Sequence, residues 1–178
     1  MTDAPDGMTH APLGGTDGER GAVRALAAEL EAARRDFFEV FDAIPPERRA
    51  EAPLTGEWGA RELIAHLGYW VGHALDALHA VEQGRGDEFD VGADEVETRN
   101  AAVARVARQT SLATVRRREE ASFRALLHRL ERLDPRLLDA MVGDWGRLED
   151  GIREDAPVHY GEHAEQLRAV LLDRDGGG

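Results

Sequence analysis

The sequence predicts an all-α protein, an antiparallel up-down bundle of four main helices with short extra helical turns. Apolar residues recur at helical spacing in several long segments of the chain. No segment shows the alternation of apolar and polar residues that is typical of a strand, and no repeat of fixed period occurs. The 178 residues suit a single domain that buries a core without disulfides, and the sequence contains no cysteine.

The first two main helices are separated by a pair of prolines. Residues 19–44 form the first predicted helix, which Pro45 and Pro46 end. Residues 59–84 form the second, and glycines end it. The inner face of the second helix holds Leu63, His66, Leu67, Trp70, Ala74, Ala77, Leu78 and Val81.

The third helical region covers residues 94–133 and is interrupted at residues 109–111. Ser111 is placed to cap the second half of this region, because a serine side chain accepts from the free amides of a helix start. Asp134 and Pro135 are a cap and a first-turn residue of a short helix.

The last long helix is predicted to follow Asp155, which would cap it, with Pro157 in the first turn. Together these helices make one bundle domain over residues 19–173. Residues 1–18 are rich in Gly, Pro, Asp and Thr and predict a disordered tail, and residues 174–178 predict a flexible C-terminal tail.

Composition and charge exclude several classes of function. The net charge of −13 argues against a nucleic-acid partner, which needs a basic surface. No apolar run approaches the roughly 20 residues that span a bilayer, and the first residues lack signal-peptide regions, so we expect a cytoplasmic protein without membrane partners. With no lysine or cysteine, and two serines outside a nucleophile-elbow motif, Schiff-base, thiolate and serine-elbow chemistry are excluded.

Three of the seven histidines form a candidate metal site. His159 and His163 are four residues apart, so their rings lie on one face of a helix and can bind one ion together. His66 lies among apolar residues of the second helix, and His159 and His163 share a face with the apolar Leu167 and Val170. We therefore expect all three side chains to point toward the core. Buried neutral imidazoles need hydrogen-bond partners or a metal. The alternative for His159 and His163 is an exposed or hydrogen-bonded pair on a helix surface.

Further polar and aromatic residues are candidates for the same site. His73 is either a competing ligand or a group farther along the same groove. Glu62 and Glu162 are candidates to orient an imidazole or to act as a general base, and the alternative for both is a solvated helix charge. The candidate pocket walls are Tyr69, Trp70, Trp145 and Tyr160.

Three imidazoles without a carboxylate make a neutral ligand shell. A divalent metal in that shell keeps its positive charge and lowers the pKa of a bound water or thiol. Zinc suits three nitrogen ligands best, and nickel, iron and cobalt also bind imidazole.

Two short motifs carry a family resemblance. GEWGARELIAHLGYW, at residues 56–70, resembles the second-helix motif of the DinB-like (YfiT-type) metal-binding helical bundles, and HYGEH, at residues 159–163, resembles the H-x-x-x-H of their last helix. The resemblance covers about residues 20–172. It implies a four-helix bundle with a long connection between helices two and three, and a metal triad of His66, His159 and His163.

The relatives suggest two kinds of activity. Many resemble thiol-dependent S-transferases or isomerases, in which a metal activates mycothiol, bacillithiol or glutathione; the mycothiol-dependent maleylpyruvate isomerase N-terminal-like proteins are one such branch. The ClbS-like resistance proteins are another, and ETRNAAVARVARQTS, at residues 97–111, resembles them. Asn100 either belongs to that resemblance or is a simple helix-start residue.

Three hypotheses remain open on the sequence. The first is a metal-dependent enzyme that activates a mycothiol-like thiol for S-transfer to, or isomerisation of, an electrophilic small molecule. The second is a hydrolase using metal-bound water, or a ClbS-like resistance protein. The third is a non-enzymatic metal- or ligand-binding bundle. A homodimer is an expectation for such bundles.

Overall fold

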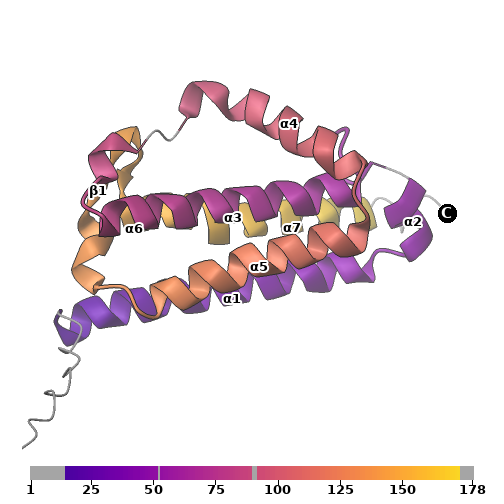
Figure 1. Ribbon diagram of the computed structural model, residues 1–178. Coiled ribbons are helices and arrows are strands. Elements are labelled where there is room, and N and C mark those ends of the chain that lie inside the picture. The colour runs from indigo at the N-terminus through magenta and orange to yellow at the C-terminus, as the bar shows by residue number, and fades with distance from the viewer. Residues whose placement is uncertain (1–14, 52, 90–91, 173–178) are drawn as a thin grey trace, which may run out of the picture.

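The computed structural model describes residues 15–51, 53–89 and 92–172, and it is a helical bundle (Figure 1). The prediction of an all-α bundle is confirmed. The four long elements of the bundle are α1 (Asp17–Ala43), α3 (Ala60–Glu82), α5 (Leu112–Leu130) and a C-terminal element that contains α6 (Leu148–Arg153) and α7 (His159–Leu172).

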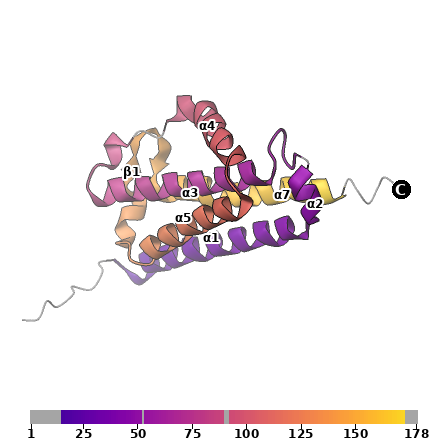
Figure 2. The same cartoon turned by 45° about the vertical axis from the view of Figure 1, so that its right-hand side comes forward.

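The connection between α3 and α5 is itself helical and sets the direction of α5. Helix α4 (Val96–Arg108) has 13 residues and is about 20 Å long. It returns the chain to the end of the bundle where α3 begins, and in both views it lies on the side of α3 away from α1 (Figures 1 and 2). Helix α5 therefore runs parallel to α3, whereas α1 and α3 are antiparallel, as are α5 and α7. The expected antiparallel order therefore fails for two neighbouring pairs, α3 with α5 and α1 with α7, because the long connection sends α5 in the direction of α3 (Figure 1).

Helix α1 begins earlier than the sequence interpretation placed it. Thr16 and Glu19 form a capping box, in which the Thr16 hydroxyl accepts from the Glu19 amide at 3.3 Å and the Glu19 carboxylate accepts from the Thr16 amide at 2.5 Å. The prediction of a tail over residues 1–18 is therefore wrong for residues 16–18. The rest of the predicted tails, at residues 1–14 and 174–178, lies outside the described residues.

The core lies between the four long elements. Helix α3 is buried along much of its length, including every residue expected on its inner face. Gly68 explains how α5 comes so close, because a Cβ atom at this position would lie 2.9 Å from the Cα of Glu119. Fully buried side chains from α1, α3, α5 and α7 include Leu26, Phe37, Phe41, Leu63, Leu67, Leu126, Leu130 and Leu167. Each such side chain contributes about 1.5–3 kcal/mol of burial free energy.

Short elements close the ends of the bundle. They are α2 (Pro46–Glu51), three 3-10 turns, η1 (Gly86–Glu88), η2 (Ala93–Glu95) and η3 (Pro135–Asp139), and the hairpin β1 (Met141–Val142), η4 (Gly143–Trp145) and β2 (Gly146–Arg147). The expectation of no strand is wrong for this hairpin, which is too short to show alternation. Gly143 and Gly146 have φ values of 44° and 93°, which suit glycine at the tight turn that carries Trp145.

The predicted caps have different outcomes. Ser111 accepts from the Thr114 amide at 3.2 Å and Asp134 accepts from the Arg136 amide at 3.2 Å, as expected. Asp155 caps nothing, because the last helical element already begins at Leu148 and continues through a π-helical turn, η5 (Glu154–Val158), into α7. Pro157 has no amide hydrogen to donate, and the wider turn accommodates it inside the helix.

None of the helices in the described part of the chain combines the length and the apolar character needed to cross a bilayer.

Candidate metal centre

Two helices supply three histidines whose rings meet inside the bundle. His66 lies on α3, and His159 and His163 lie one turn apart on α7. One ring nitrogen from each residue lies within 4.8 Å of the other two. The Nε2 atoms of His66 and His159 are 2.7 Å apart, so one ring can donate a hydrogen bond to the other. The structure therefore brings together the three histidines that the sequence singled out.

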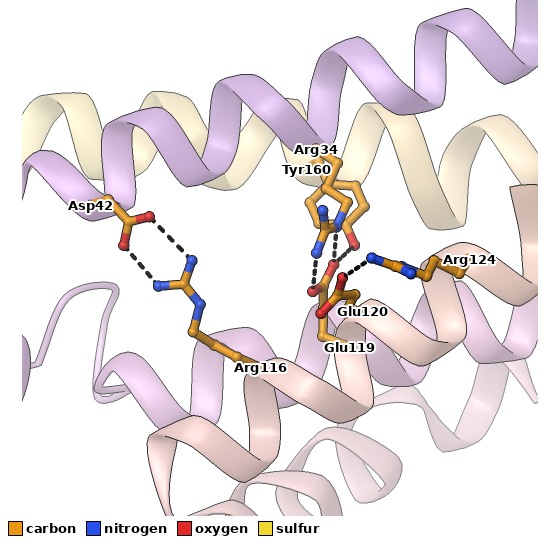
Figure 3. Close-up of polar contacts among 7 residues, drawn as sticks. All are labelled: Arg34, Asp42, Arg116, Glu119, Glu120, Arg124 and Tyr160. Carbon is orange, nitrogen blue, oxygen red and sulfur yellow. Dashed lines mark hydrogen bonds and ion pairs between the residues drawn. The ribbon is translucent and has the colours of Figure 1, made fainter.

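A cluster of polar side chains joins α7 to α1 and α5 inside the bundle. Glu119 of α5 accepts two hydrogen bonds from Arg34 of α1, at 2.6 Å and 2.8 Å, and a third from the Tyr160 hydroxyl (Figure 3). Burial, and next the Glu119 carboxylate, raise the pKa of Tyr160 well above its usual range, so the hydroxyl stays protonated and donates. These three residues, called here the paired cluster, connect α1, α5 and α7. Tyr160 follows His159 directly in the chain, so the paired cluster lies beside the histidine group.

All three imidazoles are held in the neutral form. Burial is the largest cause in each case. It lowers the pKa of His66 to about 2, with further lowering from His159 and His163 and an opposing hydrogen bond from Asn100. The pKa of His159 falls to about 4, and that of His163 is also lowered. At neutral pH the rings therefore offer lone pairs rather than positive charge, which is the form that binds metals.

Two of the three rings have partners that orient them. The Nδ1 atom of His163 lies 2.8 Å from Oε1 of Gln166, which leaves Nε2 for the centre. The backbone of Asp155 makes a hydrogen bond that raises the pKa of His159, opposing its burial. Such partners fix the tautomer and the direction of a metal-binding histidine. The buried Nδ1 of His66 has no hydrogen-bond partner with standard geometry in the described part of the chain.

The donor set fits a divalent transition-metal ion. Three neutral nitrogen donors lie close enough to bind one ion, and no carboxylate belongs to the group. Three buried nitrogens facing one another are also poor hydrogen-bond partners, since each pair needs one donor and one acceptor. A cation bound by all three lone pairs would satisfy the group more fully than the single contact between His66 and His159.

The three histidines lie in the wall of a cavity of about 450 Å³. All three tryptophans of the chain line it, and the ring of Trp58 is 4.5 Å from that of His66, measured between centroids. The Trp70 indole donates to Asn100 of α4 at 3.0 Å. Exposed carboxylates at this wall come from Glu154 and Glu162. The cavity is large enough for a small organic molecule, and its wall combines aromatic rings with polar side chains that could orient one.

A second histidine of α3 borders the same cavity without joining the group of three. Nδ1 of His73 lies 2.6 Å from Oδ2 of Asp155, and both residues are buried. Burial raises the pKa of Asp155, while the hydrogen bond with His73 opposes that shift. His73 is thus farther along the groove, one of the two positions expected for it, and Asp155 orients it.

The remaining candidates divide into those at the cavity and those away from it. Trp70, Trp145 and Glu162 line it. Glu62 instead accepts from Arg108 of α4 at 3.0 Å. The expectation that Tyr69 and Tyr160 are walls of this cavity is corrected, because Tyr160 belongs to the paired cluster, and Tyr69 lines a separate, mostly apolar cavity of about 400 Å³ between α3, α4 and α5.

Asp155 is the residue of this site that the sequence interpretation assigned to another role. Its spacing carried a signal, since Asp155, His159 and His163 are each four residues apart and so share one helix face. An aspartate before an apolar run is also typical of a helix cap, and the sequence interpretation assigned Asp155 to that role instead of to the site.

Comparison with known families agrees with this geometry. The family model described as DinB superfamily matches residues 29–168, most of the chain, and the match includes all three histidines. No curated protein and no solved structure shows significant similarity to the chain. The helical bundle, the order of its histidines and the family match agree, and the chain belongs to the DinB superfamily.

Proposed function

We propose that this protein is a divalent-metal-dependent enzyme that activates a low-molecular-weight thiol, such as mycothiol, for S-transfer to an electrophilic small molecule or for its isomerisation. The observation that carries the proposal is the group of three neutral histidines in the wall of an aromatic-lined cavity of about 450 Å³. Zinc is the metal we expect, and nickel or iron also suit imidazole donors.

In this proposal His66, His159 and His163 hold the metal, and the chain supplies the surroundings. A divalent metal in a neutral ligand shell lowers the pKa of a coordinated thiol toward neutrality. Trp58, Trp70 and Trp145 exclude water from the cavity and provide flat faces for a small unsaturated molecule.

An external thiol is favoured by the composition of the chain. The sequence has no cysteine and no lysine, so the chain itself offers neither a thiolate nor an amine nucleophile. The nucleophile would then arrive as a second small molecule, in line with the thiol-dependent enzymes that the chain resembles.

Conjugate formation tests the proposal. Zinc-loaded protein is incubated with mycothiol, bacillithiol or glutathione and an electrophilic acceptor such as maleylpyruvate, and the conjugate or isomer is measured by mass spectrometry. We expect turnover with at least one thiol, and none after chelation or in the His163→Ala variant. His128→Ala is the matched control, since this histidine is exposed on α5. Turnover of the acceptor without any thiol would favour a hydrolase, and no turnover under any condition would favour a binding protein.

A further inference from the structure

His73 and Asp155 form a second polar pair in the wall of the same cavity. Nδ1 of His73 and Oδ2 of Asp155 are 2.6 Å apart, and each residue is 7% exposed. Three aromatic rings surround the imidazole, those of Trp70, Phe89 and Trp145, with centroids 5.2–5.3 Å away. The imidazole ring of His73 is thus surrounded by one carboxyl group and three aromatic side chains.

The second ring nitrogen of His73, Nε2, has no hydrogen-bond partner among the described residues. This atom is also buried. A carboxylate can only accept, so Asp155 assigns the ring proton to Nδ1 and leaves a lone pair on Nε2. Buried polar atoms without a partner are rare in folded proteins, and each one calls for a ligand, a water or a catalytic role.

The other groups around the cavity do not provide a comparable base. The ring nitrogens of His66, His159 and His163 lie within 4.8 Å of one another, and those of His66 and His159 already share a hydrogen bond. Glu154 and Glu162 are exposed to solvent at the cavity wall. His73 is therefore the buried base at this cavity that lies outside the group of three and is oriented by a carboxyl group.

We propose that His73 is a catalytic residue that accepts the proton of the thiol bound in the cavity, and that Asp155 is a positioning residue that keeps its Nε2 free to do so. This inference rests on the function proposed above. The S–H bond breaks, its electron pair stays on sulfur, and the proton moves to Nε2. Sulfur then forms a bond to the electrophilic carbon. When the acceptor is an activated C=C bond, the proton returns from Nε2 to the carbon that receives the π electrons, and no oxidant or reductant is needed.

Counting protons on thiol binding tests this role separately from turnover. Cobalt-loaded protein is titrated with N-acetylcysteine by calorimetry at pH 7 in two buffers that differ in ionisation enthalpy, which gives the number of protons released per bound thiol. In wild-type protein His73 retains the proton. In His73→Gln we expect about one more proton per thiol to reach the buffer, and kcat to fall about 10²–10⁴-fold in the conjugation assay.

Two further variants control the measurement. Asp155→Asn keeps the ring but presents an amide that can donate to Nδ1, which moves the ring proton to Nε2, so we expect the same additional proton release as in His73→Gln. This variant also provides the test should His73→Gln fail to fold. His79→Gln alters a partly exposed histidine of the same helix that does not line the cavity, and it should match the wild type.

Each other outcome contradicts the proposal. Equal proton release in all four proteins, with thiol binding intact, would assign Nε2 to a bound water and overturn the inference while leaving the proposed function standing. Loss of cobalt from His73→Gln would make His73 a metal ligand and overturn the proton role. Absence of thiol binding to wild-type protein would overturn both this inference and the proposed function.

Discussion

Two adjacent residues of α7 belong to two different polar clusters. The clusters differ in whether their polar atoms find hydrogen-bond partners within the cluster. Tyr160 belongs to the paired cluster, in which the Glu119 carboxylate accepts from both Arg34 and Tyr160. His159 belongs to the histidine cluster, His66, His159 and His163, whose ring nitrogens lie within 4.8 Å of one another in a cavity wall. The first is complete and joins helices. In the second, the buried Nδ1 of His66 makes no hydrogen bond of standard geometry among the described residues, and unpartnered buried polar atoms are more usual at functional sites than in structural cores.

Acidification should affect the histidine cluster most. The pKa of His66 in the folded protein is about 2 and that of His159 about 4, against 6.5 in the unfolded chain. The unfolded state therefore binds more protons below pH 6.5, so folding stability is complete above that pH and is lost as pH falls toward the folded values. We expect metal-free protein to lose about 2 kcal/mol for each of these histidines between pH 6.5 and pH 5.

Urea unfolding of metal-free protein at the two pH values measures this loss. His66→Gln removes one of the two groups and should lose about 2 kcal/mol less than the wild type over the same interval. An identical loss in both proteins would mean that His66 is protonated equally well in the folded and unfolded states.

The paired cluster should respond to the removal of its central carboxylate. Glu119→Ala leaves Arg34 and Tyr160 without their acceptor, and we expect a loss of about 3 kcal/mol in the free energy of unfolding. Glu120→Ala is the matched control, since Glu120 pairs with Arg124 at an exposed position one residue away (Figure 3). It should cost less than about 1 kcal/mol. Similar losses in the two variants would contradict a structural role for the paired cluster.

Metal should stabilise the protein only through the histidine cluster. At a free zinc concentration of 100 times the dissociation constant, wild-type protein should gain about 2.7 kcal/mol, seen as a rise in melting temperature that a chelator reverses. The His159→Ala, His163→Ala double variant should gain nothing, whereas Glu119→Ala should gain as much as the wild type at temperatures where it is folded. A zinc-dependent rise in the double variant would locate the metal elsewhere.

The smallest effect concerns a single hydrogen bond of the paired cluster. Tyr160→Phe keeps the ring in the core and removes the hydroxyl that donates to Glu119. We expect a loss of about 1.5 kcal/mol, the lower end of the range for a hydrogen bond to a charged group, because Arg34 still pairs with the carboxylate. Zinc affinity should remain unchanged, and a fall of more than about tenfold would mean that Tyr160 orients the neighbouring His159.

The sequence predicts the helices better than their directions. Helical periodicity located α1, α3, α5 and the last helix, because each has one apolar face. Periodicity contains no information on direction, so the parallel order of α3 and α5 follows only from the position of α4 (Figure 1). The capping box of Thr16 and Glu19 was readable in the sequence as T-x-x-E.

For the candidate site, too, the sequence predicts some features and not others. The i, i+4 pair His159 and His163 could be inferred from spacing, and His66 from its apolar neighbours. The partners of Tyr160 and His73 could not, since Glu119 and Asp155 lie 41 and 82 residues away in the chain. Contacts at such separations depend on how helices pack, which one helix pattern does not determine.

The metal content of purified protein tests the central claim most directly. Wild-type protein, the His159→Ala, His163→Ala double variant and a His79→Ala, His128→Ala control are incubated with zinc, desalted and measured by elemental mass spectrometry. We expect about one zinc per chain in the wild type and the control, and almost none in the double variant. Equal zinc content in the wild type and the double variant would contradict the assignment of His66, His159 and His163 as a metal centre.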